Sequence, residues 1–238
     1  MSFESNLFTG RTVVVTGGTS GIGAAIAKRF RSLGADVSAC GLGSAPEGAD
    51  PAIAFTTLDV REGGALAQYL EAFPLIDVLV NCTGVSRDRR EWEKPVFDEV
   101  IGINLTSVMD ACRLALPKMG EGSSIINIAS MYATFGAADR PAYAASKGAI
   151  VQLTKSLAQE YAPAGIRVNA VAPGWIVTPL SRGLFADEAL SAPIRARIPF
   201  GRWGEAAEVA DPVVFLASPA ARYVTGISLP VDGGYLVS

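Results

Sequence analysis

Short apolar runs rich in β-branched residues alternate along the chain with stretches whose apolar residues recur at helical spacing. Thr12–Thr16 predicts a strand, and Gly21–Leu33 predicts a helix with Ile26 and Phe30 on its apolar face. The apolar run Asp77–Cys82 is typical of a strand buried on both faces. The other predicted strands are Val37–Cys40, Ile53–Leu58, Ser124–Ala129, Ile166–Val171 and Ile227–Val231. The other predicted helices are Val96–Leu116, a helix that contains Tyr143 and ends near Tyr161, and Glu205–Ala217.

This alternation predicts a parallel sheet with helices on both faces, which is a doubly wound α/β fold of about seven strands. No internal repeat or linker divides the pattern. The Gly-, Ser- and Pro-rich stretch Gly41–Pro51 is typical of a loop, and Trp175–Trp203 is a second, looser segment. We therefore expect a single domain that spans residues 1–238.

Composition supports a packed interior and narrows the range of partners. Half of the residues are hydrophobic and 18% are charged, which is not the composition of a disordered chain. The net charge of −3 lacks the basic excess of a nucleic-acid-binding surface. Cys40, Cys82 and Cys112 are odd in number and widely spaced, which favours free thiols in a reducing compartment. With no signal peptide and no uninterrupted apolar run of membrane length, we expect a cytoplasmic protein without a membrane partner.

Histidine is absent from the sequence. This excludes a Ser-His-Asp triad, a Cys-His pair and metal sites that depend on histidine. Three scattered cysteines also disfavour a thiolate cage, so we expect no metal. Proton chemistry in this chain must therefore use Tyr, Lys, Asp, Glu or a bound cofactor.

A glycine-rich loop joins the first predicted strand to the first predicted helix. The segment Thr16–Gly23 has the spacing Gly-x-x-x-Gly-x-Gly, with glycines at 17, 21 and 23. Glycine allows a tight turn and close backbone approach, and a helix N-terminus offers free N–H groups to a pyrophosphate. No Gly-Lys-Ser/Thr follows, which disfavours a kinase-type P-loop. The loop predicts a dinucleotide site, and a glycine-rich turn without a ligand is the alternative.

Tyr143 and Lys147 stand four residues apart in a predicted helix, so their side chains share a face. A phenol has a pKa of about 10 in water, and a neighbouring cation lowers that value. The pair is therefore a candidate for moving a proton to or from a substrate oxygen. The same spacing also occurs on the packed faces of ordinary helices, which is the structural alternative.

Several motifs follow one another in a set order along the chain. They are Thr16–Gly23, Asp59-Val60, Asn81-Cys82-Thr83-Gly84, Asn104, Ser130, Tyr143 with Lys147, and Pro173-Gly174 with Thr178. Together they resemble the short-chain dehydrogenase/reductase family, and the resemblance extends to Asp232-Gly233-Gly234. It implies a Rossmann-type fold, a nicotinamide cofactor and hydride transfer at a secondary alcohol or ketone. The pair Cys82-Thr83 departs from the Asn-Ala that family members often carry, so the usual Asn side chain is missing.

The resemblance implies a role for each matching residue. Tyr143 would be the acid/base, and Ser130 would hold the reacting oxygen. Lys147 would bind the nicotinamide ribose and lower the Tyr143 pKa, while Asn104 would hold a water in a proton relay behind Lys147. Residues implied to contact the cofactor, besides Tyr143 and Lys147, are Thr16, Gly17, Ser20, Gly21, Ile22 and Gly23 in the phosphate loop, Asp59 and Val60 at the adenine, Asn81 and Gly84 along the adenine ribose, and Pro173, Gly174, Ile176 and Thr178 at the nicotinamide. The purely structural alternatives are a hydrogen bond for Asn104, a turn for Ser130 and a helix cap for Asp59.

The end of the second strand normally separates NAD from NADP, because an acidic residue there bonds the ribose hydroxyls and a basic one accommodates the 2′-phosphate. Gly41 and Leu42 occupy the deciding positions and are neither acidic nor basic. Ser20 stands where NADP-dependent relatives often carry Arg or Lys. We therefore expect NAD, with NADP as the alternative.

Substrate identity should lie in the loops Val85–Pro95, Met131–Arg140 and Trp175–Trp203. The first loop carries four cations that are candidates for an anionic substrate: Arg87, Arg89, Arg90 and Lys94. Our favoured interpretation is a solvated loop with Asp88, Glu91 and Glu93 as local partners.

Three functions stay open. The first is a dehydrogenase of a polyol, sugar acid or hydroxy acid, and the second is a 3-oxoacyl-thioester reductase. The third is a non-catalytic regulatory protein that binds the cofactor. Relatives commonly form tetramers, and the helices Val96–Leu116 and Ala142–Tyr161 with the tail Tyr235–Val237 are candidates for such an interface.

Overall fold

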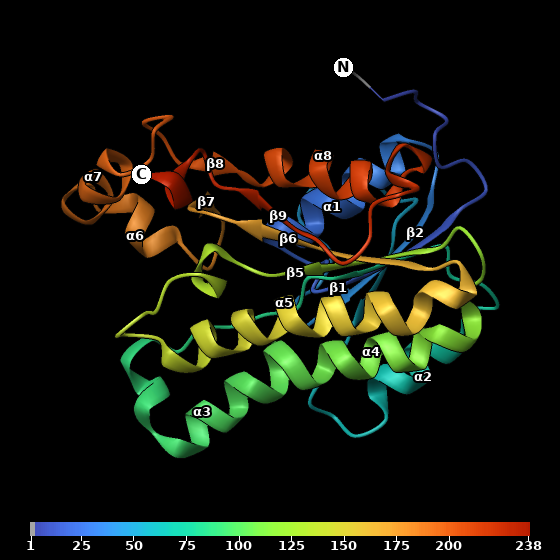
Figure 1. The fold of residues 1–238 in the computed structure, drawn as a ribbon, viewed down its shortest axis with the longest axis horizontal. Helices are drawn as coiled ribbons and strands as arrows, with labels where there is room; N and C mark the ends of the chain where they lie inside the picture. Colours follow the sequence, from blue (N-terminus) through green and yellow to red (C-terminus); the bar gives the residue numbers. More distant parts are fainter. Residues whose placement is uncertain (1–2) are drawn as a thin grey trace.

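Seven parallel strands form the central sheet in the computed structural model, which describes residues 3–238. They are β1 Thr12–Thr16, β2 Asp36–Gly41, β3 Ala54–Thr57, β4 Val78–Asn81, β5 Ser124–Ile128, β6 Arg167–Pro173 and β9 Ser228–Val231. The order across the sheet is β3-β2-β1-β4-β5-β6-β9 (Figure 1). The seven predicted strands are thus confirmed, each within two residues at either end. Because β1 pairs with both β2 and β4, the strand order reverses beside β1, where ligands bind in sheets of this kind.

Helices cover both faces of the sheet (Figure 1). One face carries α1 Gly21–Ser32 and α8 Ala206–Ala217, and the other carries α2 Ala65–Glu71, α3 Lys94–Ile101, α4 Ser107–Ala115 and α5 Pro141–Tyr161. Side chains alternate along β1, so Val13 and Val15 belong to the core beneath α1 and α8. Val14 points the other way into the core beneath α4 and α5. This two-sided burial explains the continuous apolar runs in the sequence.

The long helix predicted over residues 96–116 is interrupted. A π-helical turn at Gly102–Thr106 separates α3 from α4. Asn104 lies in this turn, and its fully buried side chain hydrogen bonds to the backbone of Val85. Periodicity alone does not reveal the interruption, because the cause is a contact with a distant loop.

Two other segments contain more structure than their sequences predict. Helix α2 was missed because it is short and follows Gly63-Gly64, although its Leu70 is buried. The looser segment 175–203 contains helices α6 Arg182–Ala186 and α7 Glu188–Ala196 and strand β7 Ile176–Val177, which pairs with β8 Gly204–Glu205. Short 3₁₀ turns lie at Asp88–Trp92, Leu116–Lys118, Met131–Ala133, Ala162–Ala164, Pro219–Ala221 and Tyr235–Val237.

One helical stretch, Lys94–Lys118, has the length and apolar composition of a membrane span. In this fold 44% of its apolar window is buried. Val100, Val108 and Ala111 are among its residues in the interior. The apolar character of this stretch is therefore that of a core helix.

Candidate active site

A cavity of about 380 Å³ lies at the carboxyl ends of β1, β2, β4, β5 and β6, beside the reversal of strand order. Most of the residues that the sequence nominates for the site line this cavity. They are Gly17, Ser20, Gly21, Ile22, Gly23, Asp59, Val60, Gly84, Ser130, Tyr143, Lys147, Pro173, Gly174, Ile176 and Thr178. Thr16, Asn81 and Asn104 are not among its lining residues.

Thr16 and Asn81 support the cavity floor from within the sheet. They are register partners at the ends of β1 and β4, and both are buried. The Asn81 side chain donates to Asn127 Oδ1 at 2.9 Å and contacts Cys112 Sγ at 3.3 Å. It therefore points into the protein interior and does not line the cavity, along whose adenine-ribose side the resemblance places Asn81.

The phosphate loop needs glycine because its backbone is packed against neighbouring backbone. Gly17 has a φ of +68°, and a Cβ there would lie 2.6 Å from the backbone of Cys82 and Thr83. A Cβ on Gly23 would collide with the Gly17 carbonyl oxygen. A side chain at either position would displace the turn between β1 and α1.

This loop has the features that a dinucleotide pyrophosphate requires. Ser20 is the N-cap residue of α1, yet its side chain makes no capping hydrogen bond. The N–H groups in the first turn of α1 are therefore not capped by Ser20, and together with the positive end of the helix dipole they are available to an anion. Nearby, Thr83 Oγ1 is buried at the cavity wall without a hydrogen-bond partner among residues 3–238, and it is a further polar atom for a ligand. In the sequence, Thr83 is notable only as part of the pair Cys82-Thr83, which departs from the family pattern.

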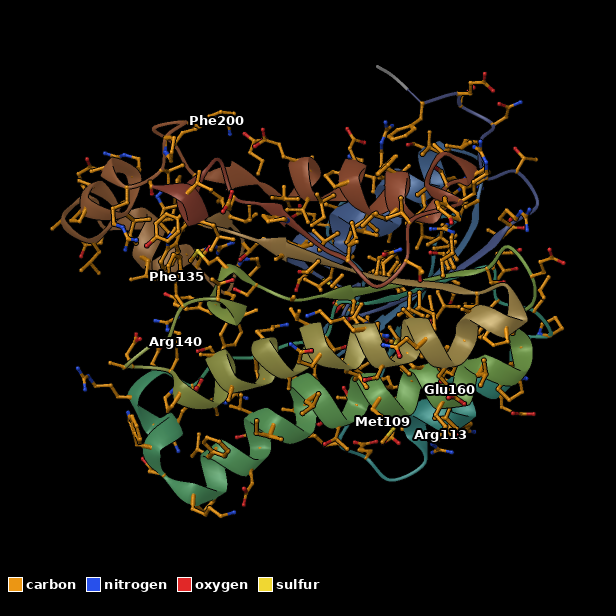
Figure 2. All side chains as sticks on the ribbon, in the orientation of Figure 1. Met109, Arg113, Phe135, Arg140, Glu160 and Phe200 are labelled. Atoms are coloured by element: carbon orange, nitrogen blue, oxygen red, sulfur yellow. The ribbon has the colours of Figure 1, made fainter. Side chains whose placement is uncertain are left out.

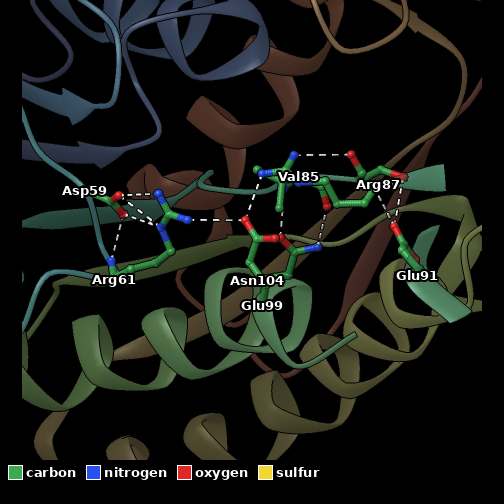
Figure 3. A network of polar contacts seen from close by, with 8 residues as sticks. Asp59, Arg61, Val85, Arg87, Glu91, Glu99 and Asn104 are labelled. Carbon is green, nitrogen blue, oxygen red and sulfur yellow. Dashed lines mark hydrogen bonds and ion pairs between the residues drawn. The ribbon is translucent and has the colours of Figure 1, made fainter. Parts of the chain in front are cut away.

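Asp59, which also lines the cavity, is paired with a cation that was not predicted to lie in the site. Arg61 Nη2 lies 2.6 Å from Asp59 Oδ2, and hydrogen bonds from Arg61 lower the Asp59 pKa. Asp59 caps no helix, since α2 begins at Ala65. Figure 3 shows that the contacts continue from Arg61 to Glu99 and from Glu99 to Arg87. This network joins the Asp59 wall of the cavity to the loop that follows β4.

Helix α5 brings Tyr143 and Lys147 to the cavity one turn apart, and Ser130 reaches it from the end of β5. Lys147 Nζ is 5.6 Å from the centroid of the Tyr143 ring and donates to the Ile128 carbonyl oxygen at 2.7 Å. Ser130 Oγ also accepts a hydrogen bond from Tyr132 N at 3.2 Å, which caps a short 3₁₀ turn. The turn role and the cavity position of Ser130 are therefore compatible.

Burial has the largest effect on the pKa values of both Tyr143 and Lys147. Burial raises the pKa of Tyr143 above its usual value of 10.0, and the Ser130 side chain and then Arg140 act in the opposite direction. Burial also lowers the Lys147 pKa to about 8. The Tyr143 pKa is raised on balance, because desolvation of the phenol outweighs the groups that lower it.

Asn104 acts on the loop after β4. Its Oδ1 accepts from Val85 N at 2.8 Å, and its Nδ2 donates to Val85 O at 2.9 Å and to Ser146 Oγ at 3.2 Å. The side chain thus holds both backbone groups of Val85 (Figure 3) and, through Ser146, links them to α5. The side chain therefore makes hydrogen bonds of the kind that the structural alternative describes.

Comparison with known proteins agrees with this geometry. A family model described as "Enoyl-(Acyl carrier protein) reductase" matches residues 16–236. The 2-(R)-hydroxypropyl-CoM dehydrogenase of Xanthobacter autotrophicus is 42% identical, with 94% of this chain and 98% of that protein covered. A 3-oxoacyl-[acyl-carrier-protein] reductase of Chlamydia pneumoniae is 38% identical over 94% of this chain and 96% of its own length. The crystal structure of a putative NAD(P)-dependent gluconate 5-dehydrogenase from Beutenbergia cavernae, with bound NADP, has a TM-score of 0.90 and 38% identity over 98% of this chain and 100% of that one.

This chain belongs to the short-chain dehydrogenase/reductase family. It is an NAD(P)-dependent oxidoreductase that acts on the CH–OH group of alcohols or on the corresponding ketones. Its Rossmann-type fold is the one that the resemblance implied.

Three loops of this short-chain dehydrogenase/reductase close the cavity above Tyr143, and they are the three proposed from the sequence. The polar and aromatic lining residues they add include Ser86, Arg87, Tyr132, Arg140 and Trp175. The Tyr132 ring packs edge-on against the rings of Tyr143 and Trp175, with centroids 6.0 and 6.1 Å apart. Sequence reasoning nominated the loops but not the two aromatic residues, because their meeting depends on how the loops pack.

The charged residues of the first loop divide into two groups. Lys94 pairs with Asp98 at 2.6 Å and Arg90 approaches Glu93 at 3.8 Å, both in exposed positions, as the solvated-loop interpretation predicts. Arg87 instead lines the cavity. The interpretation is wrong for Glu91, whose side chain is 0% exposed and forms no ion pair with a loop cation among residues 3–238.

Glu91 connects this loop to the helix that carries Tyr143. Its Oε1 accepts from Ser86 Oγ at 3.1 Å and from Arg87 N at 2.8 Å. Its Oε2 accepts from Tyr143 N at 2.8 Å, which satisfies a free N–H group in the first turn of α5. Charge-assisted bonds of this kind are short and directional. Glu91 is therefore a positioning residue for Tyr143, and no local sequence signal marks it.

We expect Glu91→Gln to lower kcat about tenfold, because small misplacements of catalytic groups are costly. An amide keeps one acceptor oxygen, so at least one of the three N–H or O–H donors would face an NH₂ group. The KM for the cofactor should stay within about twofold of the parent value, since Glu91 hydrogen bonds to no residue of the phosphate loop. Steady-state kinetics check this, with Glu93→Gln in the same loop as the control. An equal loss of kcat in both variants would contradict the assignment.

Within residues 3–238, no group of three or more Cys, Asp or Glu side chains is arranged to hold a metal ion. The three cysteines are free thiols, with Cys40 and Cys112 buried. Burial raises the pKa of Cys82, beside the cavity, to about 11.

Proposed function

We propose that residues 1–238 act as one NAD(P)-binding domain in which Tyr143 transfers a proton to or from the oxygen of a secondary alcohol or ketone. The observation that carries this proposal is the convergence of Ser130, Tyr143 and Lys147 on a cavity that also contains the phosphate loop. When bound there, the nicotinamide cofactor accepts or supplies the hydride. Asp59 and Val60 would contact the adenine end, and Pro173, Gly174, Ile176 and Thr178 the nicotinamide end.

The side chains have distinct tasks in this proposal. Tyr143 is protonated at neutral pH, because its pKa is raised, and it therefore donates the proton in the reductive direction. Ser130 orients the substrate oxygen beside the phenol. Lys147 donates one N–H to Ile128 O, so its other N–H donors can bind the ribose hydroxyls. Asn104 fixes the Val85 loop behind them.

The substrate in this proposal is a polyol, sugar acid or hydroxy acid. Supporting it are relatives named as dehydrogenases of 2-(R)-hydroxypropyl-CoM and of gluconate, which carry a hydroxyl group near a polar end. A panel of polyols, sugar acids and hydroxy acids with NAD⁺, followed by NADH absorbance, tests the proposal. Turnover of none of them, in either direction, would refute it.

A 3-oxoacyl-thioester reductase is the second candidate, because a relative of that name is 38% identical. The same panel therefore includes an oxoacyl thioester with NADPH. A kcat/KM for the thioester above that of every alcohol would favour the second candidate. The non-catalytic interpretation conflicts with family membership and with the complete set of Ser130, Tyr143 and Lys147 at the cavity.

We expect NAD to bind more tightly than NADP. Gly41 and Leu42 line the cavity at the end of β2 and offer no charge to a 2′-phosphate. Arg61, on the same side, is already paired with Asp59 and Glu99. Fluorescence titration with NADH and NADPH measures the preference, and Arg61→Gln reports on any help from that cation. Markedly tighter NADPH binding would contradict this expectation. NADPH has to be tested because the related Beutenbergia structure contains bound NADP.

We also propose a cytoplasmic homotetramer. Helices α4 and α5 lie on the same outer face of the molecule, where Figure 2 labels Met109, Arg113 and Glu160. Met109 is exposed there, as is Val237 near the C-terminus. Apolar groups on such a helix pair favour association between copies. Light scattering should give four times the monomer mass, and a monomer at all concentrations would contradict this.

A further inference from the structure

Arg140 places a cation at the substrate end of the cavity. It is the N-cap residue of α5, three positions before Tyr143, and it lines the cavity. Its side chain is only 16% exposed. Figure 2 labels it on the segment that leads into α5. The sequence nominated other arginines, in the loop after β4, for an anionic substrate.

The guanidinium is held along one edge. Arg140 Nε and Nη2 donate to Asp139 Oδ2 at 3.1 and 2.7 Å, and Nη2 lies 3.1 Å from Asp88 Oδ1. Arg140 Cζ is also 5.8 Å from the centroid of the Tyr132 ring. These contacts orient the planar group, as an anion-binding arginine requires. Nη1 has no hydrogen-bond or ion-pair partner among residues 3–238, so one end of the fork is open.

The two carboxylates face water more than the guanidinium does. The Asp88 and Asp139 side chains are 72% and 43% exposed. Exposed ion pairs are weakened by solvent and by salt. An anion inside the cavity would meet the guanidinium in a less hydrated place, where a charge-assisted hydrogen bond is stronger.

The other cavity cations have partners that are less exposed than those of Arg140. Arg61 and Arg87 both pair with Glu99, and Lys147 donates to Ile128 O. Arg140 is also close enough to the reacting end to lower the Tyr143 pKa. Arg140 and Tyr143 line the same cavity, so a substrate anion on Arg140 would share it with the carbon whose oxygen Tyr143 protonates.

We propose that Arg140 is the specificity residue of this site and that it binds a carboxylate or sulfonate group of the substrate. The inference rests on the proposed alcohol dehydrogenase function. It narrows the substrate class to secondary alcohols that carry an acidic group a short distance from the carbinol. The rings of Tyr132 and Trp175 form the wall beside the carbon chain.

Matched substrate pairs test this in the intact enzyme. The pairs are 3-hydroxybutyrate with 3-hydroxybutyramide and gluconate with glucitol, each assayed with NAD⁺. We expect the anionic member of a pair to have at least about tenfold higher kcat/KM, and Arg140→Gln to abolish that preference through KM. Arg90→Gln removes the same charge from an exposed site on the first loop and should leave the preference unchanged. Asp88→Asn should strengthen the preference, because it removes a competing carboxylate from the guanidinium.

Binding gives a readout that does not depend on turnover. Acetoacetate and acetoacetamide are titrated into Tyr143→Phe with NADH, and into the same protein carrying Arg140→Gln or Arg140→Lys. At least about tenfold tighter binding of acetoacetate that is lost in the Gln variant and partly kept in the Lys variant supports the proposal. Equal affinities for the two ligands, or a preference that survives Arg140→Gln, would overturn it. Turnover of only neutral alcohols would overturn this inference while the dehydrogenase function stands, whereas no turnover of any alcohol would count against the function itself.

Discussion

Tyr143→Phe is expected to reduce turnover by about 10²- to 10⁴-fold while cofactor affinity stays near the parent value. Removal of a positioned general acid/base costs rate enhancement of that size. The ring remains, so its edge-on contact with Tyr132 is kept. Steady-state kinetics with the best substrate of the panel and an NADH titration measure the two quantities. A variant as active as the parent would remove Tyr143 from the chemistry.

The pH dependence gives this prediction a second readout. The Tyr143 pKa is raised by burial, so the phenol holds its proton at neutral pH. Oxidation needs the deprotonated form to accept a proton, and its rate should therefore rise with pH toward 10 and beyond, while reduction should be fastest at lower pH. Ser130 lowers the Tyr143 pKa, so Ser130→Ala should move the rise in oxidation to higher pH. An unchanged profile in Ser130→Ala would contradict the contact.

Gly23→Ala is expected to have the second large effect, and it acts on cofactor binding. The new Cβ would collide with the carbonyl oxygen of Gly17, which lies in the same phosphate loop. Forcing a group into a packed site costs about 1–3 kcal/mol, which corresponds to roughly 5- to 150-fold weaker binding if the strain falls on the cofactor complex. NADH titration measures the loss, and thermal unfolding shows how much of the strain appears in the free protein.

Gly63→Ala is the matched control for this change. Gly63 is exposed, and a Cβ there would meet no atom within 4 Å. The substitution removes backbone freedom in the unfolded chain without a clash, so stability should stay equal or rise slightly. If both variants bound NADH like the parent, the phosphate loop would not be packed as described.

The fold was readable from the sequence wherever burial is local and regular. The central strands β1 and β4 are apolar runs, because a parallel strand covered on both faces is apolar at most of its positions. Val14 and its neighbours in β1 illustrate this, since all are fully buried. The π-helical turn around Asn104 was not readable, because its hydrogen bonds to Val85 join segments far apart in the chain.

The candidate site divides in the same way. The spacing of Gly17, Gly21 and Gly23 and of Tyr143 and Lys147 is a local property of a turn and of one helix, and all five residues line the cavity. Residues whose position depends on contacts between segments were missed or misread. Glu91 was expected in solvent but lies buried on the amide of residue 143.

The sequence by itself determined the fold class, the candidate phosphate loop and the candidate proton-transfer pair, because each depends on residues within one strand, turn or helix. Only the tertiary structure decided what surrounds them. It set the direction of the Tyr143 pKa, because burial outweighs the nearby charges. It also brought Arg140 into the cavity and turned Glu91 inward, because loop packing, and not local periodicity, determines which distant side chains meet.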